Sequence, residues 1–191
     1  MSDIDVRLEL YNDNKEYWNF HDKITELINS DEAINKVFAG REDRLYSAIL
    51  SLIYDKDKLI GFANLVKEKH NSHFLFLDVG IIEEYRGRHV ASQILEDLKG
   101  IQKFIIVETK QSNFLGNKSL QNRTRKLFEV EDRNVYLLQE SRYDEFIESG
   151  YLDLLKKHYD APDDRLSMLA KIYEDEDKKG KVKTKTDKEN R

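Results

Sequence analysis

The sequence predicts an α+β protein with a mixed central sheet and a helical extension at the carboxyl end. Up to about residue 139, apolar strand candidates alternate with amphipathic helix candidates. In the middle of the chain a strand, a helix and a second strand follow one another, which implies a parallel pair joined by a crossover. Beyond residue 140 only helical periodicity is evident. We therefore expect one domain over residues 1–139 and a helical extension over 140–175.

Composition limits the classes of function. The chain has 191 residues, 39% hydrophobic and 36% charged, as expected for one soluble domain. Its net charge of −5 argues against nucleic-acid binding by the whole molecule. Cysteine is absent, which excludes disulfides and cysteine nucleophiles. Because the sequence shows neither a signal-peptide pattern nor a membrane-spanning apolar run, we expect a cytoplasmic protein without membrane association.

Strand and helix signals alternate through the first third of the chain. VRLEL (6–10) alternates apolar and polar residues, as a short strand does. Apolar residues at helical spacing predict an amphipathic helix over 14–29, and Ser30 and Asp31 offer caps for a shorter helix that ends near Gly40. We expect Trp18 in the core, with the wall of a binding cleft as the alternative. Residues 44–69 contain two apolar stretches around DKDK and predict a hairpin.

The middle of the chain carries the strongest strand signals. HFLFLDVGII (73–82) is apolar on both faces, as central strands are. A helix that stops at Gly100 follows it, and KFIIVETK (103–110) is the second apolar strand. We then expect a helix within 114–127 and two short strands over 128–139, joined at the turn signal DRN.

Helical periodicity continues beyond residue 140. Two helices are predicted there, one over 146–159 and one over 166–173, separated near Pro162. The charged residues 176–191 cannot bury apolar surface, so this tail is expected to be disordered rather than to bind a polyanion.

A loop with the chemistry of an anion site lies between the strand at 73–82 and the next helix. A helix start leaves backbone N–H groups without partners and carries a positive partial charge, which suits a pyrophosphate. In YRGRHVAS, Gly87 permits a positive φ, and Arg86 and Arg88 can add charge-assisted contacts. The alternative is an ordinary charged turn before a surface helix.

The loop and the order of elements resemble the GNAT family of acyl-CoA-dependent N-acetyltransferases, over roughly residues 6–138. The family's loop is commonly written Arg or Gln, any two residues, Gly, any one, Gly or Ala. The six places are taken by Arg86, Gly87, Arg88, His89, Val90 and Ala91. His89 stands where glycine is usual, but histidine is one of the residues enriched at positive φ. We expect its imidazole to point away from the phosphates or to replace a backbone contact.

The resemblance implies α/β/α layering, acetyl-CoA as the co-substrate and an unidentified amine as the acceptor. Backbone groups around Val79, Gly80, Ile81 and Ile82 would bind the pantetheine arm as a neighbouring strand does, and Gly80 would form a bulge that parts the strands. The residues of the loop that would bind the phosphates are Arg86, Gly87, Arg88, His89, Val90, Ala91 and Ser92. Asn113 or Asn117 would contact the pantetheine, or else both cap loops.

Two residues are candidates for proton transfer in the direct attack of an amine on acetyl-CoA within a ternary complex. Asp78 is the only acid in its apolar strand. It is either the general base, directly or through water, or a structural acid paired with a lysine or capping the bulge. Thr124 stands where the family commonly has an acidic tyrosine, which leaves Tyr136, a water or the thiolate itself for that step.

The remaining features argue against a metal cofactor and leave one alternative to an enzyme. The five histidines lack metal-ligand spacing, so we expect no metal. His89 and Thr124, together with the extension, also fit a non-catalytic GNAT-fold interaction module. In either case self-association, or a protein partner bound through 140–175, is open.

Overall fold

The apolar strands assemble into one mixed sheet of eight strands in the computed structural model, which describes residues 4–10, 14–68 and 71–160. The order is β1-β3-β4-β5-β6-β8-β7, with β2 paired to β4. The strands are Val6–Leu10 (β1), Ala48–Ile49 (β2), Ser51–Asp55 (β3), Lys58–Glu68 (β4), Asn71–Ile81 (β5), Phe104–Lys110 (β6), Arg125–Val130 (β7) and Arg133–Leu137 (β8). The predicted α+β class is confirmed.

Six helices and three short 3-10 turns connect the described strands or follow them. The α-helices are Asn14–Ser30 (α1), Glu32–Phe38 (α2), Val90–Leu98 (α3), Phe114–Gln121 (α4), Tyr143–Glu148 (α5) and Tyr151–Asp160 (α6). The 3-10 turns are Glu42–Ser47 (η1), Glu83–Tyr85 (η2) and Glu140–Arg142 (η3). None of the helices in these described segments is long and apolar enough to cross a membrane.

Among the described strands, β5 and β6 form the only parallel pair. They are consecutive in the chain and joined through α3, so the crossover predicted from the strand, helix, strand order is confirmed. Their position in the middle of the sheet explains why both are apolar on both faces.

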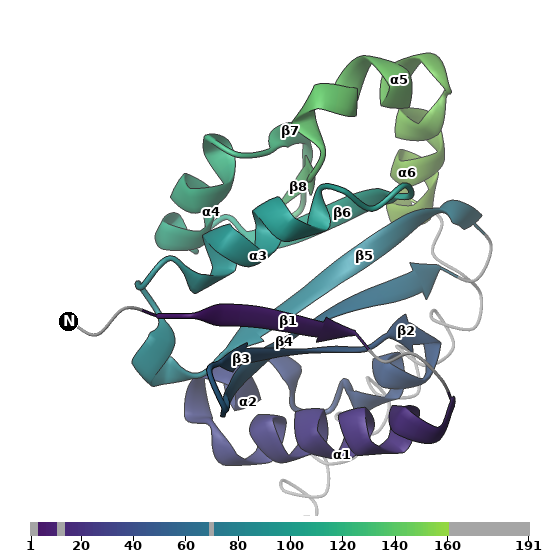
Figure 1. The fold of residues 1–191 in the computed structure, drawn as a ribbon. Coiled ribbons are helices and arrows are strands. Elements are labelled where there is room, and N and C mark those ends of the chain that lie inside the picture. Colours follow the sequence, from purple (N-terminus) through teal and green to yellow (C-terminus); the bar gives the residue numbers. More distant parts are fainter. Residues whose placement is uncertain (1–3, 11–13, 69–70, 161–191) are drawn as a thin grey trace, which may run out of the picture. The chain divides into compact units, whose positions relative to one another are not determined.

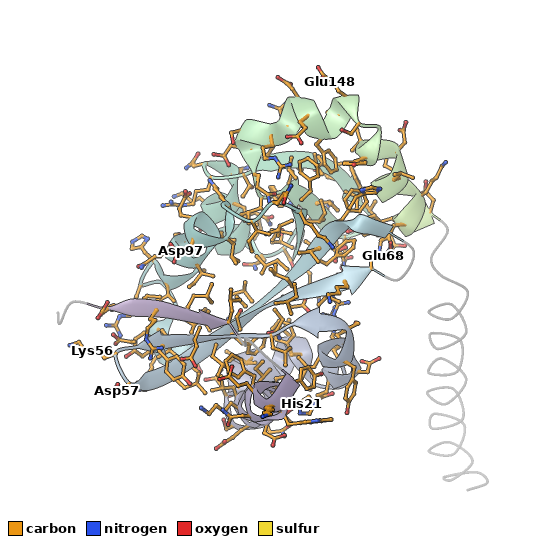
Figure 2. All side chains as sticks on the ribbon, turned by 45° about the vertical axis from the view of Figure 1, so that its right-hand side comes forward. His21, Lys56, Asp57, Glu68, Asp97 and Glu148 are labelled. Carbon is orange, nitrogen blue, oxygen red and sulfur yellow. The ribbon has the colours of Figure 1, made fainter. Side chains whose placement is uncertain are left out.

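Helices cover both faces of the sheet: α1 and α2 lie on one face, and α3 and α4 on the other (Figure 1). Leu75 and Leu77 of β5 belong to the buried cluster that contains Ile94 of α3. Since side chains alternate along a strand, Phe76 and Asp78 point to the face that carries α1 and α2. Figure 2 shows this separation in His21 of α1 and Asp97 of α3, which lie on opposite sides of the sheet.

The amino-terminal half corrects two expectations. Asp31 caps α2 as predicted, since its carboxylate accepts from the N–H of Ile34 at 3.0 Å. The predicted hairpin is β3–β4, but the RLYS segment before it is the 3-10 turn η1 and not a strand. Trp18 is 56% exposed, so of its two expected places the core is wrong.

The carboxyl-terminal half confirms one helix and corrects two expectations. The helix expected within 114–127 is α4, which ends at Gln121, and the Thr124 hydroxyl donates to the carbonyl of Leu120 at 2.7 Å just beyond it. The turn expected at DRN lies at residues 131–132 instead. The single helix predicted over 146–159 is broken into α5 and α6 near Gly150, whose φ is +78°.

By its contacts the chain divides into two compact units, Met1–Phe146 and Ile147–Arg191. The whole sheet and α1 to α4 belong to the first unit. The expected break at Pro162, the helix at 166–173 and the disordered tail at 176–191 lie outside the described residues.

Candidate functional site

The parallel strands β5 and β6 separate after a short paired stretch. Their register is Phe74↔Phe104, Leu75↔Ile105 and Phe76↔Ile106, and it ends there. Beyond this point β5 continues to Ile81 paired only with β4, while β6 continues to Lys110 paired only with β8. The carboxyl-terminal halves of two central strands therefore have facing edges that do not pair with each other.

Some backbone N–H and C=O groups of β5 point into this opening, whereas others are hydrogen-bonded to β4. The N–H of Ile82 donates to the carbonyl of Ile60 in β4 at 2.9 Å. In an antiparallel pair, alternate residues bond to the same neighbour, so Gly80, which faces Phe62, also bonds to β4. The backbone groups of Val79 and Ile81 then point toward β6. Of the four positions expected to bind pantetheine, these two face the opening.

Gly80 is required for packing and does not form the expected bulge. It lies in regular register with Phe62, and the only shift recorded between β4 and β5 is at Lys67/Glu68. A Cβ atom on Gly80 would lie 2.7 Å from the ring of Phe62. The bulge prediction is therefore wrong, because the strands separate by losing register partners after Phe76.

The loop after β5 has the conformation that an anion site requires. Gly87 and His89 have φ values of 75° and 63°, and the positive φ expected for His89 is confirmed. The first N–H to find a backbone acceptor after the turn is that of Gln93, which donates to His89 at 3.2 Å. Within the described chain, no acceptor is recorded for the N–H groups of residues 87–92. These donors surround the positive end of α3.

The two arginines of the loop are held in different directions. The Nε atom of Arg86 donates to the carbonyl of Ile81 at 3.2 Å, which ties the exposed side chain back to β5. The guanidinium of Arg88 lies 4.6 Å from the ring centroid of Tyr85. The Tyr85 hydroxyl donates to Asp55 of β3 at 2.7 Å, and this bond lowers the pKa of the Asp55 carboxyl and raises the pKa of Tyr85. The loop is thus fixed to β3 as well as to β5.

The first turn of α3 is anchored by small and apolar side chains. Val90 is buried in the core, and Ala91 is partly buried. The hydroxyl of Ser92 lies 3.3 Å from that of Ser119 on α4, within hydrogen-bonding distance. These contacts hold the helix start in place without covering its N–H groups with bulky side chains.

Asn117 is a buried junction between three elements. Its Nδ2 donates to the carbonyl oxygens of Lys110 at 3.0 Å and Asn113 at 2.9 Å. Its Oδ1 accepts from the Tyr136 hydroxyl at 2.8 Å, from Asn134 at 3.0 Å and from Thr109. All hydrogen-bonding groups of this amide are occupied within the protein, which supports the capping alternative over a pantetheine contact.

Asn113 and Tyr136 also have structural partners. The side chain of Asn113 caps α4 by accepting from the N–H of Gly116 at 3.0 Å. Tyr136 is 1% exposed and its hydroxyl donates to Asn117. Because Tyr136 is almost completely buried and its hydroxyl already has an acceptor, the structure does not favour it as the acid that protonates a thiolate.

Asp78 lies in a charged cluster on the opposite face of the sheet from α3. Both of its carboxylate oxygens accept from Arg44 of η1, at 2.8 and 3.2 Å, so the pairing partner is an arginine and not the expected lysine. Glu108 of β6 lies two residues beyond the last registered pair, Phe76↔Ile106, as Asp78 does on β5. Glu108 is bound by Arg133 at 3.0 Å.

The cluster contains residues that sequence reasoning missed: Arg41, Arg44, Glu108 and Arg133. A signal for Glu108 was present, because FLFLD (74–78) and FIIVE (104–108) are both four apolar residues followed by an acid. In the register of these two parallel strands, both acids lie just beyond the last registered pair, on the two edges that separate. The arginines come from distant segments and had no comparable signal. No group of His, Asp and Glu residues in the described segments is arranged to hold a metal ion.

A mixed sheet whose central parallel strands separate beside an exposed helix start is the fold of GNAT-type acyltransferases. The sequence profile described as the acetyltransferase (GNAT) family matches residues 7–113, more than half of the chain. The chain belongs to this family.

Solved structures similar to the chain carry related descriptions. One is a GNAT-family acetyltransferase from Streptococcus pneumoniae, with 14% identity over 70% of this chain and 97% of that one and a TM-score of 0.45. A Bacillus subtilis acetyltransferase in complex with CoA has 15% identity over 70% and 96% and a TM-score of 0.46. A Thermus thermophilus acetyltransferase has 13% identity over 72% and 98% and a TM-score of 0.47. No curated protein matches the chain.

Proposed function

We propose that the protein is an acetyl-CoA-dependent N-acetyltransferase that transfers an acetyl group to an amine by direct attack in a ternary complex. The observation that carries the proposal is the run of N–H groups at residues 87–92, which lack acceptors in the described chain and lie beside the open edge of β5. Membership of the acetyltransferase family supports acetyl transfer in general. We extend this general activity by proposing acetyl-CoA as the acetyl donor and an amine as the acceptor.

In this proposal the loop binds the phosphates and β5 binds the pantetheine arm. The N–H groups of residues 87–92 would donate to the diphosphate, as helix starts do to anions. Arg86 and Arg88 each have N–H groups left after their internal contacts and would add charge-assisted bonds. The backbone groups of Val79 and Ile81 would pair with the amides of the arm, in the manner of an added strand.

The chemical step needs little covalent help from the protein. The amine nitrogen attacks the thioester carbonyl, a C–N bond forms and the C–S bond breaks. We assign the amine proton to Asp78, directly or through water: each of its oxygens accepts one bond from Arg44 and keeps a second lone pair. The leaving thiolate takes a proton from solvent, so neither Tyr136 nor Thr124 is required. Positioning of the two reactants supplies most of the acceleration.

Binding and turnover test the proposal separately. Calorimetry of the full chain should detect acetyl-CoA binding at micromolar to low millimolar concentration, and a panel of primary amines should release CoA with at least one acceptor. Asp78→Asn should lower kcat by about 10²-fold or more while leaving acetyl-CoA affinity unchanged. Arg7→Gln is the matched control, because it removes an exposed arginine of β1 whose contacts are with Glu9, Lys56 and Tyr54, outside the proposed site. An absence of binding at millimolar acetyl-CoA would rule the proposal out.

One observation favours the non-catalytic alternative. Thr124, at the position where the family commonly has an acidic tyrosine, is buried and bonded to Leu120. If acetyl-CoA binds but no amine is acetylated across the panel, the interaction module is the better description. Its partner would then be sought with the extension at 140–175 as bait.

A further inference from the structure

Counted over the described residues, the charged cluster at the separation of β5 and β6 has one cation more than it has anions. Its acids are Asp78 of β5 and Glu108 of β6, and each is held by its own arginine. Arg44 binds Asp78 at 2.8 and 3.2 Å, and Arg133 of β8 binds Glu108 at 3.0 Å. The fifth member, Arg41, precedes η1 and has these four groups as its electrostatic neighbours. Three arginines and two acids leave one positive charge.

Arg41 is the member for which the described part of the chain records no side-chain partner. Its backbone is fixed, because its N–H donates to Phe38 at 3.0 Å and its carbonyl accepts from Arg44 at 3.2 Å. Its side chain is partly buried. Within residues 4–10, 14–68 and 71–160, no hydrogen bond or ion pair to the guanidinium is recorded.

The environment of this guanidinium is unfavourable for an unpaired charge. Burial lowers the pKa of Arg41 most, and Arg44 and then Arg133 lower it further, against the opposing effect of Asp78 and Glu108. Arginine nevertheless stays protonated in proteins, so it cannot escape this cost by losing its proton. A partly buried cation with no anion of its own is best explained by an anion that arrives with a ligand.

The geometry of the site limits what that anion can be. A guanidinium presents a planar fork of N–H donors that matches a carboxylate through two parallel bonds. The phosphates of the co-substrate are assigned to residues 87–92, next to α3, whereas Asp78 points to the face that carries α1 and α2. The anion at Arg41 therefore belongs to the acceptor.

We propose that the acceptor is a small amine that also carries a carboxylate, bound by Arg41 while its amine lies at Asp78. The inference rests on the proposed acetyl transfer and names the substrate class for it. Arg41 lies directly before η1, and its carbonyl accepts from the N–H of Arg44, the residue that binds Asp78 at 2.8 and 3.2 Å. This placement suits a ligand whose amine and carboxylate are close together, as they are in a free amino acid.

The test measures recognition of the carboxylate without requiring turnover. N-acetyl amino acids and the corresponding N-acetyl amino acid amides are titrated by calorimetry, with and without saturating CoA. These pairs have the same shape and differ in one charge. For at least one pair, the wild-type protein should bind the acid at least tenfold more tightly than the amide. In Arg41→Gln this ratio should fall to about one, and in Arg41→Lys it should lie between.

Two controls keep the result interpretable. CoA affinity should be the same in wild type, Arg41→Gln and Arg41→Lys, and Arg7→Gln should retain the full preference for the acid. Because Arg41 has no recorded internal acceptor, Arg41→Gln should melt at the wild-type temperature or above it. A melting temperature lowered by 5 °C or more would identify an internal role for Arg41 and overturn the proposal.

Other outcomes separate the inference from the proposed function. Equal affinity for acid and amide across all pairs, or a preference that survives in Arg41→Gln, would overturn the carboxylate site even if acetyl-CoA binds. Failure to bind acetyl-CoA, with the acid preference intact, would remove the proposed function and leave an anion site. Tighter binding of an acetylated acidic peptide than of any N-acetyl amino acid would replace the small-molecule class with a protein amino terminus.

Discussion

At the scale of single residues, His89 shows how the loop keeps its shape without the usual glycine. Its φ of 63° and ψ of 18° lie in the left-handed region. Its side chain is exposed and makes no capping hydrogen bond to α3. The residue therefore supplies a backbone conformation, and nothing in the structure requires its imidazole.

Replacing His89 separates the backbone role from the side-chain role. His89→Gly should raise the free energy of unfolding by about 0.5–1 kcal/mol, since glycine adopts a positive φ without the steric penalty. His89→Val should lower it by about 1–2 kcal/mol, because a β-branched residue is strongly disfavoured there. Urea unfolding measures both. Acetyl-CoA affinity should be unchanged in His89→Gly, and a tenfold loss would show instead that the imidazole takes the place of a backbone contact.

Individual residues also show where sequence reasoning stops. The conformation of His89 could be predicted, because it depends on residue type and on a turn of known shape. The roles of Asn117 and Gly80 could not, since the partners that decide them, Tyr136 and Phe62, lie 19 and 18 positions away in the chain. Spacing identified these positions as special without identifying what they touch.

At the scale of elements, the open edge of β5 makes a prediction about amide hydrogen exchange. Val79 and Ile81 direct their N–H groups toward the space that β6 leaves, while Gly80 between them bonds to β4. Without ligand, the amides of Val79 and Ile81 should exchange much faster than that of Gly80. With CoA at about 100 times its Kd, their protection should rise well beyond the roughly 100-fold expected from overall stabilisation. Residue-resolved NMR exchange measures all three.

Gly80 is the internal control for that experiment. Its protection should rise by no more than overall stabilisation requires, because its N–H already has a partner in β4. Equal changes at Val79, Gly80 and Ile81 would mean that the pantetheine arm does not pair with β5. Protection confined to residues 87–92 would place the ligand on the loop alone.

Most elements could be predicted from periodicity, but several of their boundaries could not. The apolar runs that became β5 and β6 were long, and their order fixed the parallel pairing. By contrast, the apolar pattern of 44–69 does not reveal that residues 44–47 belong to the 3-10 turn η1 and not to a strand. Periodicity predicts one helix over 146–159 because the apolar residues share a face on both sides of Gly150, whereas the positive φ of Gly150 divides it into α5 and α6. The spacing of apolar residues shows which face of a helix or strand is buried, whereas the point at which a helix ends depends on backbone conformation.

At the scale of the whole molecule, two electrostatic effects oppose each other in binding a polyanion. The net charge of −5 repels acetyl-CoA at long range, whereas Arg86, Arg88 and the positive end of α3 attract it at short range. Salt screens exposed charges beyond about 10 Å at 0.1 M and beyond about 3 Å at 1 M. The sign of the salt dependence therefore reports which effect controls binding.

We expect the local attraction to control binding, because contact distances are short and the net charge is spread over the surface. The Kd for acetyl-CoA should rise by about tenfold between 0.1 and 1 M NaCl in calorimetric titrations of the full chain. Arg86→Glu should weaken binding by about tenfold or more at 0.1 M and flatten the salt dependence, since it replaces an attraction at the loop with a repulsion. Arg7→Gln on β1 should keep the wild-type dependence. A Kd that falls as salt is added, or an Arg86→Glu variant with unchanged affinity, would show that the phosphates bind elsewhere than at residues 86–92.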